Sequence, residues 1–189
     1  MIAKSLIVCI DDDQAMLAAI ARILRREPSF DVRASSSPQE VLGWIATEEI
    51  AVLVSDYDMP EMTGAQLAGR AKQIRPETVR ILLTGQHSLE TAIDGIHQGE
   101  VFRFIRKPFE EFILRSAVME AVERHQQLVA LSADRQQRER RSALREALEA
   151  EYPGISEVPS RDGPLDVTAD PWAEALVLGV LGLDDRLER

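Results

Sequence analysis

Four short apolar segments of this 189-residue chain each end at polar or charged side chains. These side chains are Asp11, Asp12 and Asp13 after the first segment, and then Asp56, Thr84 and Lys107 after later ones. Carboxylates that are brought together repel one another unless a cation neutralises them, and an all-oxygen cluster suits Mg²⁺. A carboxylate beside such a cation can attack phosphorus and form an acyl phosphate. These residue types therefore predict phosphoryl transfer to an aspartate.

The predicted chemistry gives each group one task. The equatorial oxygens of a transferring phosphoryl group need cations and hydrogen-bond donors around them. Mg²⁺ would serve one oxygen, the Lys107 ammonium a second and the Thr84 hydroxyl a third, with Asp56 as the nucleophile. Asp13 is expected to cap the following helix or to face solvent, because aspartate is favoured at that position.

The elements that must position these groups follow from the apolar pattern. Strands are predicted at 6–10, 30–34, 51–55, 79–83 and 101–105, with helical spacing in the segments between them, at 16–24, 41–45, 67–74 and 89–96. This alternation predicts an α/β fold, a doubly wound parallel sheet covered on both faces. The loops after the strands then converge on one edge, where the polar side chains would meet.

The last helical pattern does not stop where a five-stranded domain would end. It starts near Glu110 and continues to about Glu151 without a glycine or proline. Residues 132–142 have almost no apolar face, so a strong coiled coil is not predicted there. We therefore expect three parts: a domain at 1–125, a helical extension at 126–151, and an acidic, proline-rich tail at 152–189 with a short apolar helix at 172–183.

Composition excludes several classes of protein. The formal net charge of −10 argues against a surface that binds nucleic acid. No apolar stretch approaches the roughly 20 residues that span a bilayer, and the first apolar run is too short for a secretory signal. We expect a cytoplasmic protein without membrane contact. The single cysteine, Cys9, is expected to be a small buried hydrophobe. The histidines show no metal-ligand spacing, so solvated or helix-face positions are expected for His87, His97 and His125.

Four strings carry a family resemblance. LIVCIDDD, VLVSDYDMPEMTG, ILLTG and FRFIRKPF, in this order, resemble the receiver domain of two-component response regulators over about two thirds of the chain. The resemblance implies a flavodoxin-like fold with strand order 2-1-3-4-5. It also implies these site residues: Asp56 as phosphoacceptor; Asp11, Asp12, Asp56 and the backbone carbonyl of Asp58 as Mg²⁺ ligands; Thr84 and Phe104 as a switch pair; and Lys107 as phosphate sensor, with a cis bond at Lys107–Pro108.

The resemblance further implies the partners. A sensor histidine kinase or a phosphotransfer protein would supply the phosphoryl group, and Asp56 would return it slowly to water without enzymatic turnover of another substrate. Because 152–189 leaves no room for a basic recognition helix, we expect output through contact with an unidentified protein effector. The 110–151 helix could form a homodimer, act as a docking arm or serve as a spacer.

Three alternatives stay open at this point. The chain could be a haloacid-dehalogenase-like phosphatase that uses the Asp56-Tyr57-Asp58 motif, although that motif would follow the first strand of such a domain. It could be a regulator that controls transcription indirectly. Phe104 could be a permanently buried core ring instead of a switch.

Overall fold

The structure, a computed structural model, describes residues 4–85 and 101–153. Its contacts divide the chain into two units, Met1–Gln136 and Gln137–Arg189. Several sequence predictions lie outside the described residues: the helix at 89–96, His87 and His97, and the tail helix at 172–183.

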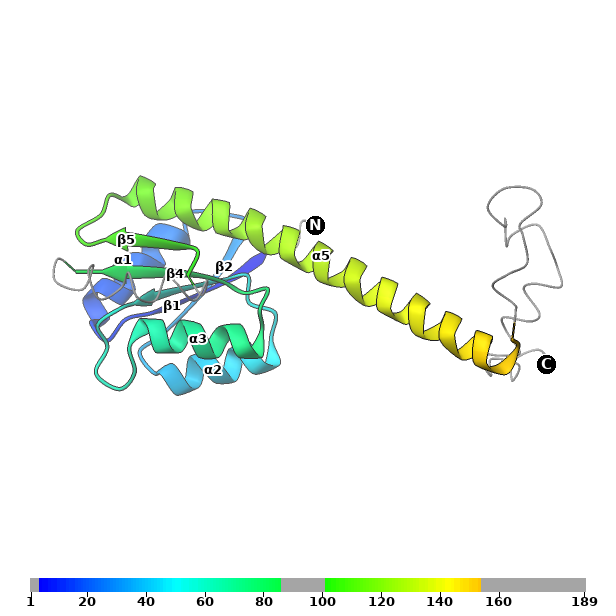
Figure 1. Cartoon of the computed structure of the whole chain (residues 1–189). Helices are drawn as coiled ribbons and strands as arrows, with labels where there is room; N and C mark the ends of the chain where they lie inside the picture. The colour runs from blue at the N-terminus through cyan, green and yellow to red at the C-terminus, as the bar shows by residue number, and fades with distance from the viewer. Residues whose placement is uncertain (1–3, 86–100, 154–189) are drawn as a thin grey trace, which may run out of the picture. The chain divides into compact units, whose positions relative to one another are not determined.

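Five strands form one parallel sheet in the order β2-β1-β3-β4-β5 (Figure 1). The strands are β1 (Ser5–Ile10), β2 (Phe30–Ser35), β3 (Val52–Asp56), β4 (Val79–Thr84) and β5 (Arg103–Arg106). The predicted fold class and strand order are confirmed, although β5 begins two residues later than its apolar run. The strand order reverses between β1 and β3, and their carboxyl ends border the crevice where doubly wound sheets bind ligands.

Helices cover both faces of this sheet (Figure 1). The described helices are α1 (Gln14–Leu24), α2 (Pro38–Thr47), α3 (Gly64–Ile74) and α5 (Glu111–Glu151). Buried side chains of α1 and of the first part of α5 pack on one face, and those of α2 and α3 pack on the other. The two apolar layers hold the strand ends, and with them the polar side chains, in fixed positions.

Local capping starts the helices near the carboxyl edge of the sheet. The Asp13 carboxylate accepts hydrogen bonds from the amides of Ala15 (2.8 Å) and Met16 (3.2 Å), which confirms its predicted capping role. Thr63 caps α3 and forms a reciprocal capping box with Gln66. Each cap satisfies amides that the first helical turn leaves unpaired, so each helix has a defined first residue.

Two side chains with reactive groups lie in or beside the core on the α1–α5 face. Cys9 is fully buried, as predicted, and burial raises the pKa of its thiol to about 12. His125 lies on the face of α5 that packs on the domain and is only 6% exposed. Of the two positions expected for His125, the solvated one is therefore wrong and the helix-face one is what the structure has.

The described helices include none that could cross a membrane, since none combines sufficient length with sufficient apolar character.

Candidate functional site

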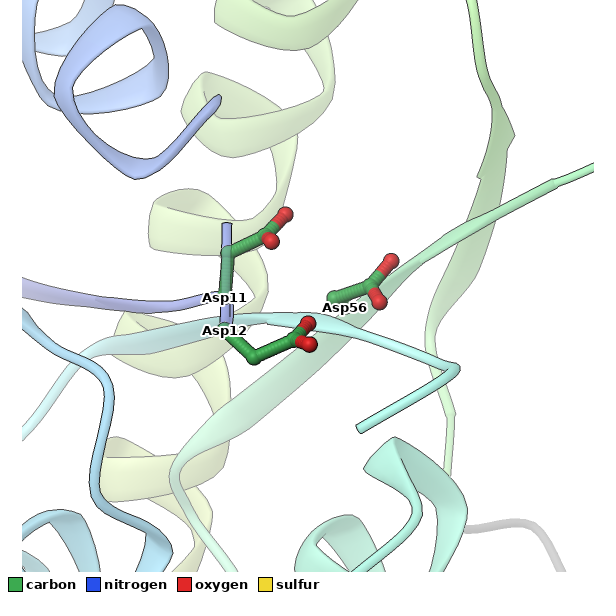
Figure 2. Close-up of side chains that lie close together, drawn as sticks. All are labelled: Asp11, Asp12 and Asp56. Carbon is green, nitrogen blue, oxygen red and sulfur yellow. The ribbon is translucent and has the colours of Figure 1, made fainter. Parts of the chain in front are cut away.

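Three carboxylates meet at the carboxyl ends of β1 and β3. Figure 2 shows the side chains of Asp11 and Asp12, from the loop after β1, directed toward Asp56 at the end of β3. One oxygen from each lies within 4.8 Å of the others, and this is the one such group of acidic or ligating side chains in the described part of the chain. Asp11 and Asp56 are buried, at 1% and 6% exposure, whereas Asp12 is exposed.

Lys107, which follows the edge strand β5, neutralises part of this charge. The Lys107 ammonium lies 2.8 Å from Asp11 Oδ2 and 2.7 Å from Asp56 Oδ1. Lys107 follows β5, and its amide donates to the carbonyl of Thr84 (2.8 Å), which holds the loop against the end of β4. The Lys107–Pro108 bond is cis, as the resemblance implied.

Backbone amides hold the remaining oxygens of the two buried carboxylates. The amide of Asp13 donates to Asp11 Oδ1 (2.9 Å), and the amide of Asp58 donates to Asp56 Oδ2 (3.1 Å). Each buried carboxylate therefore has one oxygen on an amide and the other on Lys107. This arrangement fixes the orientation of both groups, because each is held at two points.

The charges remain only partly compensated. Burial raises the pKa of Asp11, and the opposing hydrogen bonds from Lys107 and from the Asp13 amide offset this only in part. Burial alone would lower the pKa of Lys107, but Asp11 and Asp56 together raise it. Three carboxylates and one ammonium leave an excess of negative charge, so the site favours a further cation.

The donor set fits Mg²⁺. The three ligating groups are all oxygens, one of them exposed to water, and this matches an ion that binds through a few carboxylates and keeps several waters. Asp11, Asp12 and Asp56 would hold such an ion. Of Asp58, the structure shows the amide bonded to Asp56; the predicted role of its carbonyl stays a prediction.

Gly64 is a site residue that the sequence analysis missed. A Cβ atom added to Gly64 would lie 2.1 Å from the backbone oxygen of Asp56, far inside contact distance. The Gly64 amide also donates to the carbonyl of Tyr57 (2.9 Å). The start of α3 can therefore approach Asp56 only without a side chain. The available signal was the glycine that closes the string VLVSDYDMPEMTG, but its contact partner is not visible in the sequence.

The two predicted switch residues lie beside the site, and each has its own contacts. Thr84 is fully buried, and its hydroxyl donates to the carbonyl of Gly85 (3.2 Å). Phe104 is partly exposed and packs on a small cluster formed by Tyr57 and Leu82. A fully buried core ring is thus not what this structure has at Phe104.

Comparison with known proteins agrees with this geometry. Residues 7–119 match the family model of the response regulator receiver domain. The DNA-binding transcriptional regulator NtrC of Azospirillum brasilense is 31% identical over 134 residues, which cover 71% of this chain and 27% of that protein. The transcriptional regulatory protein FixJ of Rhizobium meliloti is 30% identical over 126 residues, covering 66% of this chain and 59% of FixJ.

A solved structure shows the same correspondence. The response regulator receiver domain protein from Clostridium thermocellum superposes with a TM-score of 0.61 at 29% identity, covering 66% of this chain and 98% of that one. The chain spans about a quarter of the length of curated relatives such as NtrC. The family match extends over more than half of the chain and includes residues of every strand, and the chain therefore belongs to the response regulator receiver domain family.

Proposed function

We propose that this protein is a phosphorylation-dependent response regulator that accepts a phosphoryl group on Asp56. The observation that carries the proposal is the bridge from Lys107 to both buried carboxylates, at 2.8 and 2.7 Å. It places the Lys107 ammonium next to Asp56 Oδ1, where this cation would lie beside a phosphoryl group bonded to the Asp56 carboxylate. A structural ion pair would need only one carboxylate, whereas a phosphoryl site needs a second for a metal.

The proposed reaction moves a phosphoryl group from the phosphohistidine of a sensor kinase or phosphotransfer protein. A phosphorus–oxygen bond to Asp56 forms as the phosphorus–nitrogen bond breaks, and the electron pair leaves with the imidazole. Mg²⁺, held by Asp11, Asp12, Asp56 and the backbone carbonyl of Asp58, would neutralise the carboxylates and the incoming oxygens. Lys107 and the Thr84 hydroxyl contact the remaining phosphoryl oxygens.

The readout is a shift in the population of two side-chain arrangements. Once Asp56 carries a phosphoryl group, the Thr84 hydroxyl exchanges the Gly85 carbonyl for a phosphoryl oxygen. The space it vacates lets the partly exposed Phe104 ring turn inward. The phosphorylated protein then differs from the unphosphorylated one in the surface around β5 and the start of α5, and a partner can recognise this difference.

The output belongs to the same proposal. We expect a cytoplasmic regulator that signals by contact with a protein effector and does not bind nucleic acid or membranes, and that turns over no substrate of its own. The net charge of −10 supports this choice over direct DNA binding. The phosphatase alternative is not favoured, because two strands and an acidic pair precede Asp56.

Intact mass spectrometry tests the chemistry. The full chain incubated with acetyl phosphate and Mg²⁺ should gain one phosphoryl mass, and Asp56→Asn should gain none. Asp31→Asn serves as the matched control, because it changes an exposed carboxylate outside the acidic site and should still be modified. No gain in the wild type, or an equal gain in Asp56→Asn, would contradict the proposal.

Light scattering tests the oligomeric state. A homodimer through the 110–151 helix should appear as a doubled mass when beryllofluoride is added. A monomer in both states leaves that helix as a docking arm or spacer.

A further inference from the structure

His125 is the last buried residue of α5 in the described part of the chain, and it is held at two points. Its Nδ1 lies 2.9 Å from the backbone carbonyl oxygen of Glu77, and its Nε2 lies 3.3 Å from Glu49 Oε1. Glu49 lies just before β3 and Glu77 just before β4. One ring thus joins α5 to two loops at the amino ends of the central strands.

The two partners determine which ring hydrogens are needed for both hydrogen bonds to form. A carbonyl oxygen only accepts, so a hydrogen bond to Glu77 requires a hydrogen on Nδ1. An ionised carboxylate also only accepts, so the contact with Glu49 requires a hydrogen on Nε2. Only the imidazolium form carries both. In the neutral ring, one nitrogen lone pair faces an acceptor, and one of the two contacts becomes repulsive.

We propose that His125 is a proton-dependent clamp that sets where α5 separates from the domain. With the ring protonated, both contacts form and α5 is pinned through this turn. With the ring neutral, the contact with Glu49 is lost and the turn is released. The clamp is therefore closed at low pH and opens as pH rises, which is the direction in which an imidazolium loses its proton.

The turn of α5 around His125 has few other contacts with the domain, so its position depends on the clamp. Two grooves, of about 540 and 210 Å³, are both lined by His125, Glu49 and Val129. After His125 only Leu128 and Val129 are partly buried before α5 becomes exposed over residues 130–147. Few apolar contacts therefore support this turn, which is typical of a segment that opens locally.

Charged groups on each neighbouring element act in opposite directions. Glu49 favours the imidazolium, although its side chain is 68% exposed and its attraction is screened. Glu77, which lines the smaller groove with His125, carries a charge of the same sign. Lys4 lines one groove and Arg75 the other, and both cations disfavour it. Arg75 is turned toward the carbonyl of Ile45, to which its Nε donates (2.9 Å). On α5 itself, the residues one turn away are apolar: Ala121, Val122, Leu128 and Val129.

The clamp is separate from the proposed phosphorylation. Its partners precede β3 and β4, whereas Asp56 and Thr84 are the last residues of the same two strands. A variant of the clamp can therefore change α5 while the acidic site stays intact. Because of this separation, the clamp and the proposed phosphorylation can be tested independently of each other.

Hydrogen exchange followed by mass spectrometry on the full chain tests the proposal. At pH 7.5, the amides of residues 121–132 should be about two- to fivefold less protected than at pH 5.5, after correction for the intrinsic pH dependence of exchange, the ratio expected for a partly exposed ion pair. In Glu49→Gln, the amide can accept from or donate to Nε2, so the ratio between the two pH values should fall toward one.

Two further variants isolate the ring. His125→Asn keeps a donor near the position of Nδ1 but removes Nε2, so the pH ratio should disappear while His87 and His97 remain. Glu123→Gln neutralises an exposed carboxylate on the same helix and should retain the wild-type ratio. A wild-type ratio of one, or a wild-type ratio that persists in Glu49→Gln or His125→Asn, would overturn the clamp.

Phosphorylation of the same variants separates the two proposals. Each should gain the phosphoryl mass from acetyl phosphate at the wild-type level. A missing pH ratio together with normal modification means that the clamp fails while the proposed function stands. A normal ratio without modification of any variant means the reverse.

Discussion

The carboxyl ends and the amino ends of the parallel strands carry similar groups in different surroundings. These two sides are called the carboxyl edge and the amino edge of the sheet. At the carboxyl edge, Lys107 is 20% exposed and lies between two buried carboxylates. At the amino edge, His125 lies between a backbone carbonyl and the Glu49 carboxylate, whose side chain is 68% exposed. Both side chains come from late in the chain and join segments that are distant in sequence. The difference is the burial of their acidic partners.

Burial decides what each arrangement can do. A buried ion pair is costly to break, because removing one partner leaves an uncompensated charge away from water. An exposed pair contributes little and is screened by salt. The carboxyl edge is therefore a fixed electrostatic site suited to phosphoryl chemistry. At the amino edge, the formed and broken states of the contact differ little in free energy, so the contact can open and close.

Gly64→Ala should break the carboxyl edge with the largest effect. Its new Cβ would lie 2.1 Å from the backbone oxygen of Asp56, and the atom it meets cannot rotate away. We expect the free energy of unfolding to fall by about 3 kcal/mol or more, measured by urea denaturation.

Gly43→Ala is the matched control for that substitution. Gly43 lies inside α2, and a Cβ there meets nothing within 4 Å. Since alanine is the better helix former, we expect Gly43→Ala to stabilise the protein by about 0.5–1 kcal/mol. Equal effects of the two substitutions would mean that the contact at Asp56 does not constrain the site.

Lys107→Met should have the next largest effect. It removes the ammonium that compensates Asp11 and Asp56, and we expect a loss of about 2 kcal/mol in the free energy of unfolding in EDTA, less than for a fully buried pair. Millimolar Mg²⁺ should then stabilise the variant more than the wild type, since a cation replaces the lost charge. Calorimetry with and without Mg²⁺ measures both effects.

Arg26→Met provides the comparison with an exposed ion pair. Arg26 Nη1 lies 2.5 Å from Glu111 Oε2, but the two side chains are 56% and 48% exposed. We expect a loss below about 1 kcal/mol. If Arg26→Met loses as much stability as Lys107→Met, burial does not make the ion pairs of Lys107 stronger than an exposed ion pair.

Thr78→Val should have a smaller effect than Lys107→Met, and it acts at the amino edge. Thr78 is buried, and its hydroxyl donates to the carbonyl of Ile50 (2.9 Å), beside the loops that hold His125. Valine keeps the shape but removes the donor, so we expect a loss of about 1 kcal/mol. Thr47→Val is the control, because its hydroxyl bonds to Gly43 on an exposed helix face and its loss should stay within about 0.5 kcal/mol. Indistinguishable denaturation curves for the two variants would contradict this assignment.

Much of the fold was predictable because its signals are local. Apolar runs of strand length and helical spacing determine each element from a few neighbouring residues, and parallel strands bring their ends to one edge. Asp11, Asp12 and Asp56 could therefore be predicted to lie at one edge, because each follows or ends a predicted strand of a parallel sheet. Asp13 was predictable as a cap for the same reason, since its partners are two and three residues away.

Only the tertiary structure decided contacts between residues that are distant in the chain. Lys107 and Asp11 are 96 residues apart, and nothing in either segment shows that one ammonium would reach both buried carboxylates. The need for glycine at 64 depends on how closely α3 approaches β3. His125 was expected at a solvated or helix-face position, and only the tertiary structure shows that it is buried and lies against Glu49 and Glu77. Sequence determines which residues can do chemistry, whereas packing determines their distances, burial and partners.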